Sequence, residues 1–287
     1  MARSADRVIA YASAAARDAD AVSFIGGLTK SANQDAEGSD RLQLGLPYGQ
    51  DRLIEALAEA NPNLVAVFVS GNAVAMPWID RVPAVLEAWY SGSEAGNALA
   101  DVLFGAVNPS GKLPFTFPVR LEDNGAIALG EYTGGDWVKY TESIFVADLC
   151  AEKQQIAPLF AFGHGLSYTT FAYDNIRSDR TELASDGTIR ISVDVTNTGE
   201  RAGQEVVQLY VGDCASALPR PVKELKGFEK VALEPGQART VTCALTAEAL
   251  QYYDDTKGAW VAEPGDFKAF VGAASDDIRG VVDFTLK

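Results

Sequence analysis

At 287 residues, the chain is longer than one ordinary domain and long enough for two hydrophobic cores. Its 24 basic and 39 acidic residues give a formal net charge of -15, which would repel the phosphates of a nucleic acid. No apolar run is long enough to cross a membrane, and the first twenty positions lack the pattern of a secretory signal. We therefore expect a soluble chain with no nucleic-acid partner and no membrane partner.

The three cysteines and the single histidine limit the kinds of catalytic or metal site that the chain can form. Cys150, Cys214 and Cys243 are widely spaced with no CxxC pair, which is typical of free thiols and indicates neither a disulfide framework nor a zinc site. The single histidine, His164, leaves little material for a Ser-His-Asp triad or a histidine metal centre. No metal site is predicted.

Helix-like and strand-like segments alternate in the first part of the chain. Helical spacing of apolar residues predicts helices over 5–18, 48–60 and 91–105, and short apolar runs predict strands over 21–27, 64–71 and 82–90. This alternation predicts a parallel α/β sheet, and ligands bind such sheets at the carboxyl ends of the strands. The loops after the first two strands, 26–41 and 70–78, are therefore the candidate walls of a site.

The second part of the chain has a different texture. Residues 106–172 are rich in Gly, Pro and aromatic residues, which is typical of an ordered connector with few regular elements. After Phe171–Asp174, apolar and polar residues alternate in about seven short strands, which predicts an antiparallel sandwich of the immunoglobulin or fibronectin type. We predict an incomplete α/β domain over 1–172, connector included, and an all-β sandwich domain over 173–287.

Three carboxylates crowd the loop after the first predicted strand. Asp35, Glu37 and Asp40 lie close to Arg41 within the segment NQDAEGSDR. Like charges nearby raise the pKa of a carboxyl group, which suits that group to donate a proton near neutral pH. An acidic loop on an acidic protein is more often a solvated loop or a cation site, so the pattern alone leaves both interpretations open.

Four long motifs carry a resemblance to glycoside hydrolase family 3. Its C-terminal α/β domain is matched in order and spacing by GGLTKSANQDAEGSDRLQLGLPYGQDRLI, NPNLVAVFVSGNAVAMPW, LEAWYSGSEAGNALADVLFGAVNPSGKLPFTFP and PLFAFGHGLSYTTF. The last third, from VDVTNTGERAGQEVVQLYV to VKELKGFEKVALEPGQ, is similar to the fibronectin type III-like domain that follows in many members. The chain thus resembles the C-terminal part of a β-glucosidase-type member.

The resemblance implies a retaining, exo-acting enzyme that releases a terminal β-linked sugar with two carboxyl groups, one a nucleophile and the other an acid/base. The acid/base of the EGxDR-type loop would here be Glu37, with Asp40 and Arg41 as supporting groups. A competing interpretation places Arg41 in an internal ion pair with Asp40 or Asp35. Such chemistry needs no metal and no organic cofactor, and its substrate would be a β-linked oligosaccharide or glycoside.

Other matching positions have two interpretations each. Ser70 at the end of the second strand could approach the sugar, although a strand-end glycine such as Gly71 more often serves a turn. Trp78 and Trp89 could stack on a sugar ring, yet their apolar surroundings favour core packing. His164, which lies between two glycines, is interpreted as a hydrogen-bonded structural residue rather than a base.

The sequence also departs from the family pattern. The family's nucleophile is an aspartate on an N-terminal (β/α)8 barrel, and neither that barrel nor the opening strand of the α/β domain is found in this sequence. We therefore expect one uncovered sheet edge and a chain that is inactive by itself. Where members commonly continue from YxExIFV into Gly-Tyr-Arg, this chain has Ala147, Asp148 and Leu149.

Three interpretations of function follow. The first is the C-terminal part of a β-glucosidase-like enzyme, which acts only when joined to a barrel domain. The second is one subunit of a split enzyme, which would expose apolar surface around the sheet edge and the 28–47 loop. The third is a non-catalytic carbohydrate-binding or scaffolding module, which would expose aromatic residues on the sandwich. This third interpretation ranks last, because most of the sandwich aromatics fit core or turn positions: Tyr210, Phe228, Tyr252, Tyr253 and Trp260.

Overall fold

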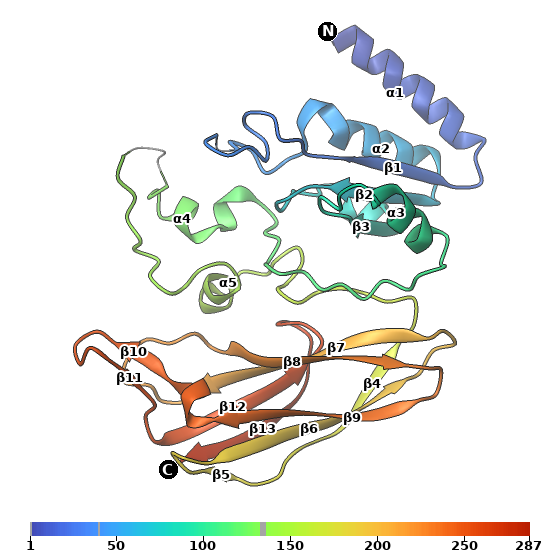
Figure 1. The fold of residues 1–287 in the computed structure, drawn as a ribbon. Helices are drawn as coiled ribbons and strands as arrows, with labels where there is room; N and C mark the ends of the chain where they lie inside the picture. The colour runs from blue at the N-terminus through green and yellow to red at the C-terminus, as the bar shows by residue number, and fades with distance from the viewer. Residues whose placement is uncertain (1, 40, 133–135) are drawn as a thin grey trace. The chain divides into compact units, whose positions relative to one another are not determined.

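The computed structural model describes residues 2–39, 41–132 and 136–287. The chain forms two compact units (Figure 1). The first contains the residues up to Leu103 together with Phe117–Asp123 and Tyr132–Lys139, and the second contains the remainder. Most of the connector therefore groups with the sandwich, and the domain boundary between 172 and 173 stays a prediction.

A parallel three-stranded sheet forms the centre of the first unit. The strand order is β1-β2-β3 and both neighbouring pairs are parallel, which confirms the predicted α/β class. The strands are β1 (Val22–Gly27), β2 (Leu64–Val69) and β3 (Ala84–Glu87), the helices are α1 (Ala2–Arg17), α2 (Gln50–Ala60) and α3 (Ala95–Leu103), and two short 3-10 helices cover Pro47–Gly49 and Ile79–Arg81.

The middle strand is the most enclosed element of this unit. Four of the six β2 residues have no exposed surface, as an unbroken apolar run in a parallel sheet predicts. The ring of Phe68 packs between Phe24 and Trp78, at centroid distances of 6.1 and 5.5 Å. Ile54 and Leu57 of α2 are also buried, and α2 contacts both β1 and β2. This core supports the carboxyl ends of the strands.

Asn61 ends α2 and links it to α1. Its side-chain amide donates to the carbonyl oxygen of Ala16 at 2.8 Å and to that of Ala19 at 2.7 Å. Asn61 is 5% exposed, so both amide hydrogens are satisfied within the protein rather than by solvent. Asn61 thus ends α2 and also satisfies carbonyl oxygens at the C-terminal end of α1.

The outer strand β1 and helix α1 leave apolar side chains in solvent. The only partner of β1 among the described strands is β2, so the sheet has the uncovered edge that the sequence predicted. Ile25 of β1 is 59% exposed, and Val8 and Tyr11 of α1 are 61% and 80% exposed. The apolar surface of this unit is therefore only partly covered by the chain itself.

The connector has few regular elements, as predicted. It contains a short 3-10 helix (Leu121–Asp123) and the helices α4 (Gly125–Ala128) and α5 (Asp148–Gln154). Ala147, directly before α5, has φ 51° and ψ -117°, a backbone conformation that suits glycine and strains residues with a Cβ atom. At the position where the family pattern has glycine, Ala147 thus adopts a backbone conformation that suits glycine.

The second unit contains the predicted sandwich, which is antiparallel except for the parallel pair of β5 and β13. One sheet has the order β5-β13-β12-β7-β8, the other has the order β4-β6-β9, and β10 pairs with β11 in a separate hairpin. The strands are β4 (Phe171–Ser178), β5 (Glu182–Leu183), β6 (Thr188–Asn197), β7 (Gly203–Asp213), β8 (Glu224–Leu233), β9 (Ala238–Thr246), β10 (Tyr252–Asp254), β11 (Ala259–Val261), β12 (Gly265–Gly272) and β13 (Ile278–Leu286), with a 3-10 helix at Ala247–Leu250.

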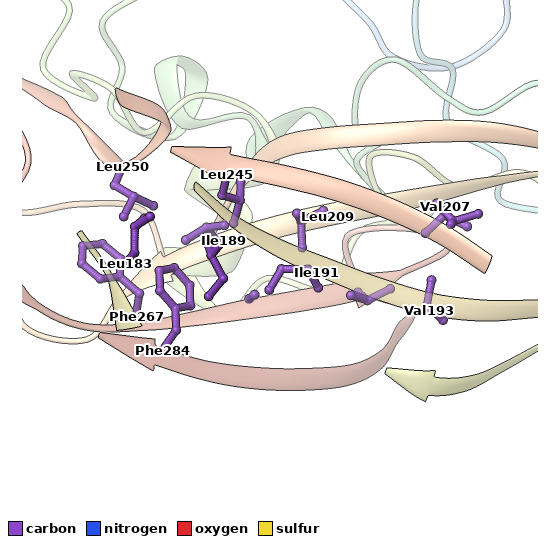
Figure 2. Close-up of a cluster of buried hydrophobic side chains, with 14 of the residues drawn as sticks. Leu183, Ile189, Ile191, Val193, Val207, Leu209, Leu245, Leu250, Phe267 and Phe284 are labelled. Carbon is purple, nitrogen blue, oxygen red and sulfur yellow. The ribbon is translucent and has the colours of Figure 1, made fainter. Parts of the chain in front are cut away.

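Alternate residues of these strands build one continuous core between the two sheets. In β6, Ile189, Ile191, Val193 and Val195 are at most 2% exposed, whereas the residues between them are not fully buried. Figure 2 shows Ile189, Ile191 and Val193 meeting side chains from the facing sheet, such as Leu209. This alternation is what fixes the register of each strand.

Two further findings concern the whole described chain. Cys150 is buried, Cys214 is exposed and Cys243 is half-buried, and all three are free thiols. Among residues 2–39, 41–132 and 136–287, no helix has the length and apolar character needed to cross a membrane.

Candidate active site

The three parallel strands of the first unit end together. In the sheet register, Gly27 lies beside Val69 and Phe68 beside Glu87, so the loops that follow begin at one edge. Gly27 has φ 132°, and a Cβ atom there would lie 2.2 Å from the Val69 carbonyl oxygen. Only glycine fits this close approach between strand ends. Glycine is therefore sterically required at position 27, where β1 ends at this edge.

Gln50 fixes the start of the first loop. Its side-chain oxygen accepts from the Gly27 amide at 2.8 Å, and its side-chain nitrogen donates to the Gly27 carbonyl oxygen at 2.9 Å. Because Gln50 is the first residue of α2, the end of β1 is joined to the helix that follows the loop. Both ends of the intervening loop are thus held at one place.

Asp35 joins the first loop to the other two. One carboxylate oxygen, Oδ2, accepts from the Gly71 amide at 2.6 Å and from the Tyr90 hydroxyl at 2.8 Å. Gly71 follows β2 and Tyr90 follows β3. Partial burial and the hydrogen bond to anionic Asp35 raise the pKa of the Tyr90 hydroxyl to about 12. Tyr90 therefore stays a donor at neutral pH.

Glu37 lies at the tip of a tight turn in the same loop. An antiparallel bridge joins Ala36 to Ser39, and Gly38 has φ 74°, which glycine adopts without strain. The Ser39 hydroxyl accepts from the Asn33 amide at 2.8 Å, so the turn is held from within the loop. The Glu37 side chain is exposed to solvent at this tip. Its carboxyl group is free to meet a ligand.

Arg41 lies on the other side of the turn and points into the protein. Its Nη2 donates to the carbonyl oxygen of Ala73, while its Nη1 is buried with no hydrogen-bond partner among the described residues. Burial lowers the pKa of the Arg41 guanidinium, and nearby Asp35 opposes that shift. The expected ion pair with Asp35 is not formed, because no oxygen of that carboxylate lies within 4.0 Å of the guanidinium. Asp40, the other predicted supporting carboxylate, lies outside the described residues.

A second carboxyl group, Glu87, lies beneath the loops at the end of β3. Its Oε1 accepts from the Trp89 amide at 3.1 Å, while its Oε2 is buried without a hydrogen-bond partner in the described part of the chain. The Ser70 hydroxyl lies 3.2 Å from Glu87 Oε1 and 2.9 Å from the Asn72 carbonyl oxygen, and its single hydrogen can serve one of them. Burial raises the pKa of Glu87 to about 7, against the hydrogen bonds from Trp89 and Ser70. Fully buried Ser70 thus supports the site floor.

The two tryptophans that could have stacked on a sugar ring, Trp78 and Trp89, pack against other aromatic rings. Trp78 has no exposed surface, stacks on Phe68 and donates from its indole nitrogen to Asp51 at 2.9 Å. Trp89 packs edge-on against Phe117 at a centroid distance of 6.3 Å. The Trp78 indole therefore offers no open ring face and can support the site only from below.

Sequence reasoning missed the two groups that contribute most to the geometry of this edge. The sequence pattern does not mark Tyr90 or Glu87, and it marks Asp35 only as a like charge near Glu37 and as a candidate ion-pair partner of Arg41. The missing signal was positional, since β3 ends at the same edge as β1 and β2, and residues 87–90 fall there. No cluster of three or more His, Cys, Asp or Glu side chains able to hold a metal occurs within the described ranges.

Comparison with known families agrees with this arrangement. Residues 2–168 match the model of the glycosyl hydrolase family 3 C-terminal domain, and residues 205–275 match that of the fibronectin type III-like domain. The chain belongs to glycosyl hydrolase family 3. It is the C-terminal part of a family 3 protein, as the sequence resemblance predicted.

Family 3 relatives match nearly the whole chain but extend well beyond it. β-Glucosidase BoGH3A of Bacteroides ovatus is 51% identical over 94% of this chain and 36% of its own length. Thermostable β-glucosidase B of Acetivibrio thermocellus is 46% identical over 95% of this chain and 36% of its own length. The chain therefore spans about a third of the length of these curated relatives.

Solved family 3 structures share the fold. A β-glucosidase from Kluyveromyces marxianus in complex with glucose has a TM-score of 0.90 and 42% identity, covering 98% of this chain and 33% of its own. DesR, a β-glucosidase from Streptomyces venezuelae in complex with D-glucose, has a TM-score of 0.91 and 39% identity, covering 99% of this chain and 36% of its own. The α/β unit and the sandwich thus match the C-terminal region of family 3 enzymes.

Proposed function

We propose that this chain supplies the acid/base side of a retaining, exo-acting β-glucosidase, with Glu37 as the acid/base. The observation that carries the proposal is the exposed carboxyl group of Glu37 on a turn held at the carboxyl ends of three parallel strands. The relatives that match this chain are named as β-glucosidases, and ligands of open α/β sheets bind at this edge. Terminal β-linked sugars are the proposed substrates.

The chemistry divides between two parts of the enzyme. Glu37 would protonate the glycosidic oxygen as the bond to the leaving group breaks, while a carboxylate on a separate N-terminal barrel attacks the sugar carbon and forms the covalent intermediate. The Glu37 carboxylate would then take a proton from the water that hydrolyses this intermediate. The chain alone would lack the nucleophile, so we expect no turnover without a barrel, whether the barrel is joined to the chain or separately encoded.

The test joins this chain to the N-terminal part of a relative such as the Bacteroides ovatus enzyme and compares leaving groups. General-acid assistance matters for an alkyl β-glucoside, whose leaving group is a strong base, and much less for a dinitrophenyl β-glucoside. Glu37→Gln is expected to lower kcat/KM, which reports formation of the covalent intermediate, about 100- to 10,000-fold on the alkyl glucoside and far less on the dinitrophenyl glucoside. Steady-state rates on both substrates measure the difference.

A matched control separates the role of Glu37 from a general loss of charge. Glu59→Gln removes an exposed carboxylate from α2, and we expect wild-type rates on both glucosides. Equal losses of kcat/KM on both substrates for Glu37→Gln, or no loss on either, would contradict its role as the acid/base. The chain alone, and the chain mixed with the unlinked barrel part, test the split-enzyme interpretation in the same assay.

One observation favours carbohydrate binding by the sandwich as a second candidate function. The prediction that most sandwich aromatics fill core or turn positions is correct for Tyr210, which is 1% exposed, but wrong for three others: Phe228, Tyr253 and Trp260 are 67%, 54% and 64% exposed. Tyr253 and Trp260 are cross-strand partners in the β10–β11 hairpin, with ring centroids 5.7 Å apart. Two exposed rings on one hairpin face can stack against the C–H faces of a sugar.

The hairpin presents these rings on a rigid turn. Asp254 Oδ1 accepts from the Thr256 amide at 3.0 Å and the Thr256 hydroxyl at 2.6 Å, and Lys257 pairs with the same carboxylate at 2.8 Å. Affinity electrophoresis in gels containing a soluble β-glucan would test binding. Trp260→Ala should abolish retardation, while Phe228→Ala, which removes an exposed ring elsewhere, should retain it. Unretarded wild-type chain would remove this candidate function.

A further inference from the structure

We infer that Asp35 is the positioning residue of the site, holding the Glu37 turn across the ends of all three strands. This inference rests on the proposed role of Glu37 and adds a residue that acts through it. Asp35 lies two residues before Glu37, and its Oδ2 accepts from groups that are 36 and 55 residues away along the chain. One oxygen atom therefore connects three loops.

Both donors approach Asp35 from well-defined places. Gly71 directly follows the fully buried Ser70, and a Cβ atom at Gly71 would lie 3.0 Å from Tyr90 Cε2 and 3.4 Å from Asp35 Oδ2. The absence of a side chain at Gly71 thus leaves room for the tyrosine and the carboxylate together. The ammonium group of Lys30 lies over the Tyr90 ring, 5.8 Å from its centroid. Both donors thus have room to lie beside the Asp35 carboxylate.

The other contacts of the loop cannot replace this connection. Thr29 bonds to Gln34, and Asn33 bonds to Ser39, so these bonds stay within the loop. Gln34 donates to the hydroxyl of Tyr48, which is 80% exposed and therefore a weak anchor. Arg41 is anchored at Ala73, on the far side of the turn.

Glu37 therefore lies between two anchors, Asp35 before the turn and Arg41 after it. Hydrogen bonds to a charged acceptor are stronger than neutral ones, so the Asp35 anchor restrains the turn more than the bonds inside the loop. General-acid catalysis requires the donor to stay within hydrogen-bond reach of the leaving oxygen, and a misplacement of about 1 Å costs on the order of 100-fold in rate. Loss of the anchor should thus impair proton donation specifically.

The first experiment uses the chain alone and needs no catalysis. Trypsin can cut after Lys30, which is exposed within the loop. Asp35→Ala should speed cleavage at this bond by about 10- to 100-fold, because two hydrogen bonds to a charged group no longer oppose loop opening. Tyr90→Phe, which removes one of the two donors, should give an intermediate rate. Thermal unfolding followed by circular dichroism should show the same transition in all variants.

A matched variant tests whether the loss of any exposed carboxylate would speed trypsin cleavage after Lys30. Glu94→Ala removes an exposed carboxylate that accepts from Asn97, three residues along the chain, and joins no other loop. It should be cut at the wild-type rate. Cleavage of Asp35→Ala at the wild-type rate would overturn the anchor.

The second experiment asks whether the anchor serves catalysis. In the enzyme joined to its barrel part, Asp35→Ala should lower kcat/KM on the alkyl glucoside about 10- to 100-fold, and kcat/KM on the dinitrophenyl glucoside about 3-fold or less. Asp35→Asn, whose amide oxygen can still accept from both donors, should recover most of the loss. A purely structural role would lower both rates together.

The outcomes separate the two proposals. If Glu37→Gln shows no dependence on the leaving group, the proposed acid/base role fails, while the trypsin rates still decide whether Asp35 anchors the loop. If Glu37→Gln behaves as expected and Asp35→Ala lowers the rates on both glucosides equally or not at all, the positioning role is overturned.

Discussion

The β-sandwich and the α/β unit bury their apolar residues to very different extents. The sandwich encloses a continuous core from both sheets, including Leu209, Phe267 and Leu286, each at most 3% exposed. The α/β unit buries its middle strand but leaves Ile25 and Tyr11 in solvent, and none of the described residues of α3 is fully buried. The sandwich sequence thus completes its own core, whereas the α/β sequence provides a functional edge and leaves its flanks open.

This difference in burial separates the unit that contributes most of the stability from the unit that carries the candidate site. Alternating apolar residues that meet across two sheets contribute most of their free energy by leaving water. Buried polar atoms without hydrogen-bond partners among the described residues occur in both units, for example Arg41 Nη1 in the first and Ser216 Oγ in the second, so they do not distinguish the two. The continuous apolar core lies in the sandwich, while the α/β unit leaves apolar side chains in solvent. We therefore expect the α/β unit to be the less stable of the two.

The largest expected effect comes from opening a cavity in the sandwich. Leu209→Ala should cost about 2–5 kcal/mol of unfolding free energy in that unit, because Leu209 is 1% exposed and its neighbours cannot collapse freely. Urea unfolding should show a shifted transition by far-ultraviolet circular dichroism, which reports mainly the strands. In a Trp260→Phe background, which removes the tryptophan of the sandwich unit, tryptophan fluorescence should keep its midpoint, since Trp78, Trp89 and Trp137 lie in the other unit. A common shift of both signals would mean that the units unfold together.

A smaller, pH-dependent effect is expected at Glu87. Its pKa is raised from 4.5 to about 7, so the folded state binds a proton that the unfolded state has released between these values. The free energy of unfolding of the α/β unit should therefore fall as pH rises through this window and level off above it. Glu87→Gln should lack this fall, gaining roughly 1–3 kcal/mol relative to the wild type across the window.

The measurement is urea unfolding followed by tryptophan fluorescence at several pH values in the Trp260→Phe background, where the remaining tryptophans lie in the first unit. Glu59→Gln, an exposed carboxylate change in the same unit, should follow the wild-type curve. Parallel curves for the wild type and Glu87→Gln would show that Glu87 does not hold its proton in the folded state.

The smallest effect is expected at the open edge, in a matched pair of threonine substitutions. Val271→Thr places a hydroxyl group in the sandwich core, where the residue is 2% exposed, and should cost about 1–2 kcal/mol. Ile25→Thr changes a side chain that is 59% exposed and should stay within about 0.5 kcal/mol of the wild type. Both are read from the same urea unfolding curves. A cost above about 1 kcal/mol at Ile25 would indicate that the β1 edge is covered in solution.

Much of the fold could be predicted because the spacing of apolar residues along the chain indicates which side chains of a helix or strand are buried. The run at 64–71 predicted β2, and the strict alternation of residues 188–197 predicted β6 within the sandwich. The uncovered edge at β1 was also predicted from the resemblance. The exposure of Tyr253 and Trp260 was not, because a cross-strand pair on a short hairpin has the same spacing as a pair facing a core.

The site could be predicted only as a loop. The three carboxylates and Arg41 marked residues 35–41, but Asp35, Gly71 and Tyr90 meet because three strands end in register, and register is a long-range property. Glu87 resembles any polar residue at the end of a strand until the loops above it are in place. Burial by distant segments, rather than neighbouring residues, sets its pKa.

The strained Ala147 has a consequence for the heat resistance of this chain. Its torsion angles suit glycine, and hydrogen bonds from Leu149 to Val146 and from Ala151 to Ala147 hold the backbone on that path. A residue with a Cβ atom thus occupies a backbone path that glycine adopts without strain, and the surrounding turns hold it there. Laboratory selection for heat-resistant variants of this chain should therefore favour glycine at this position.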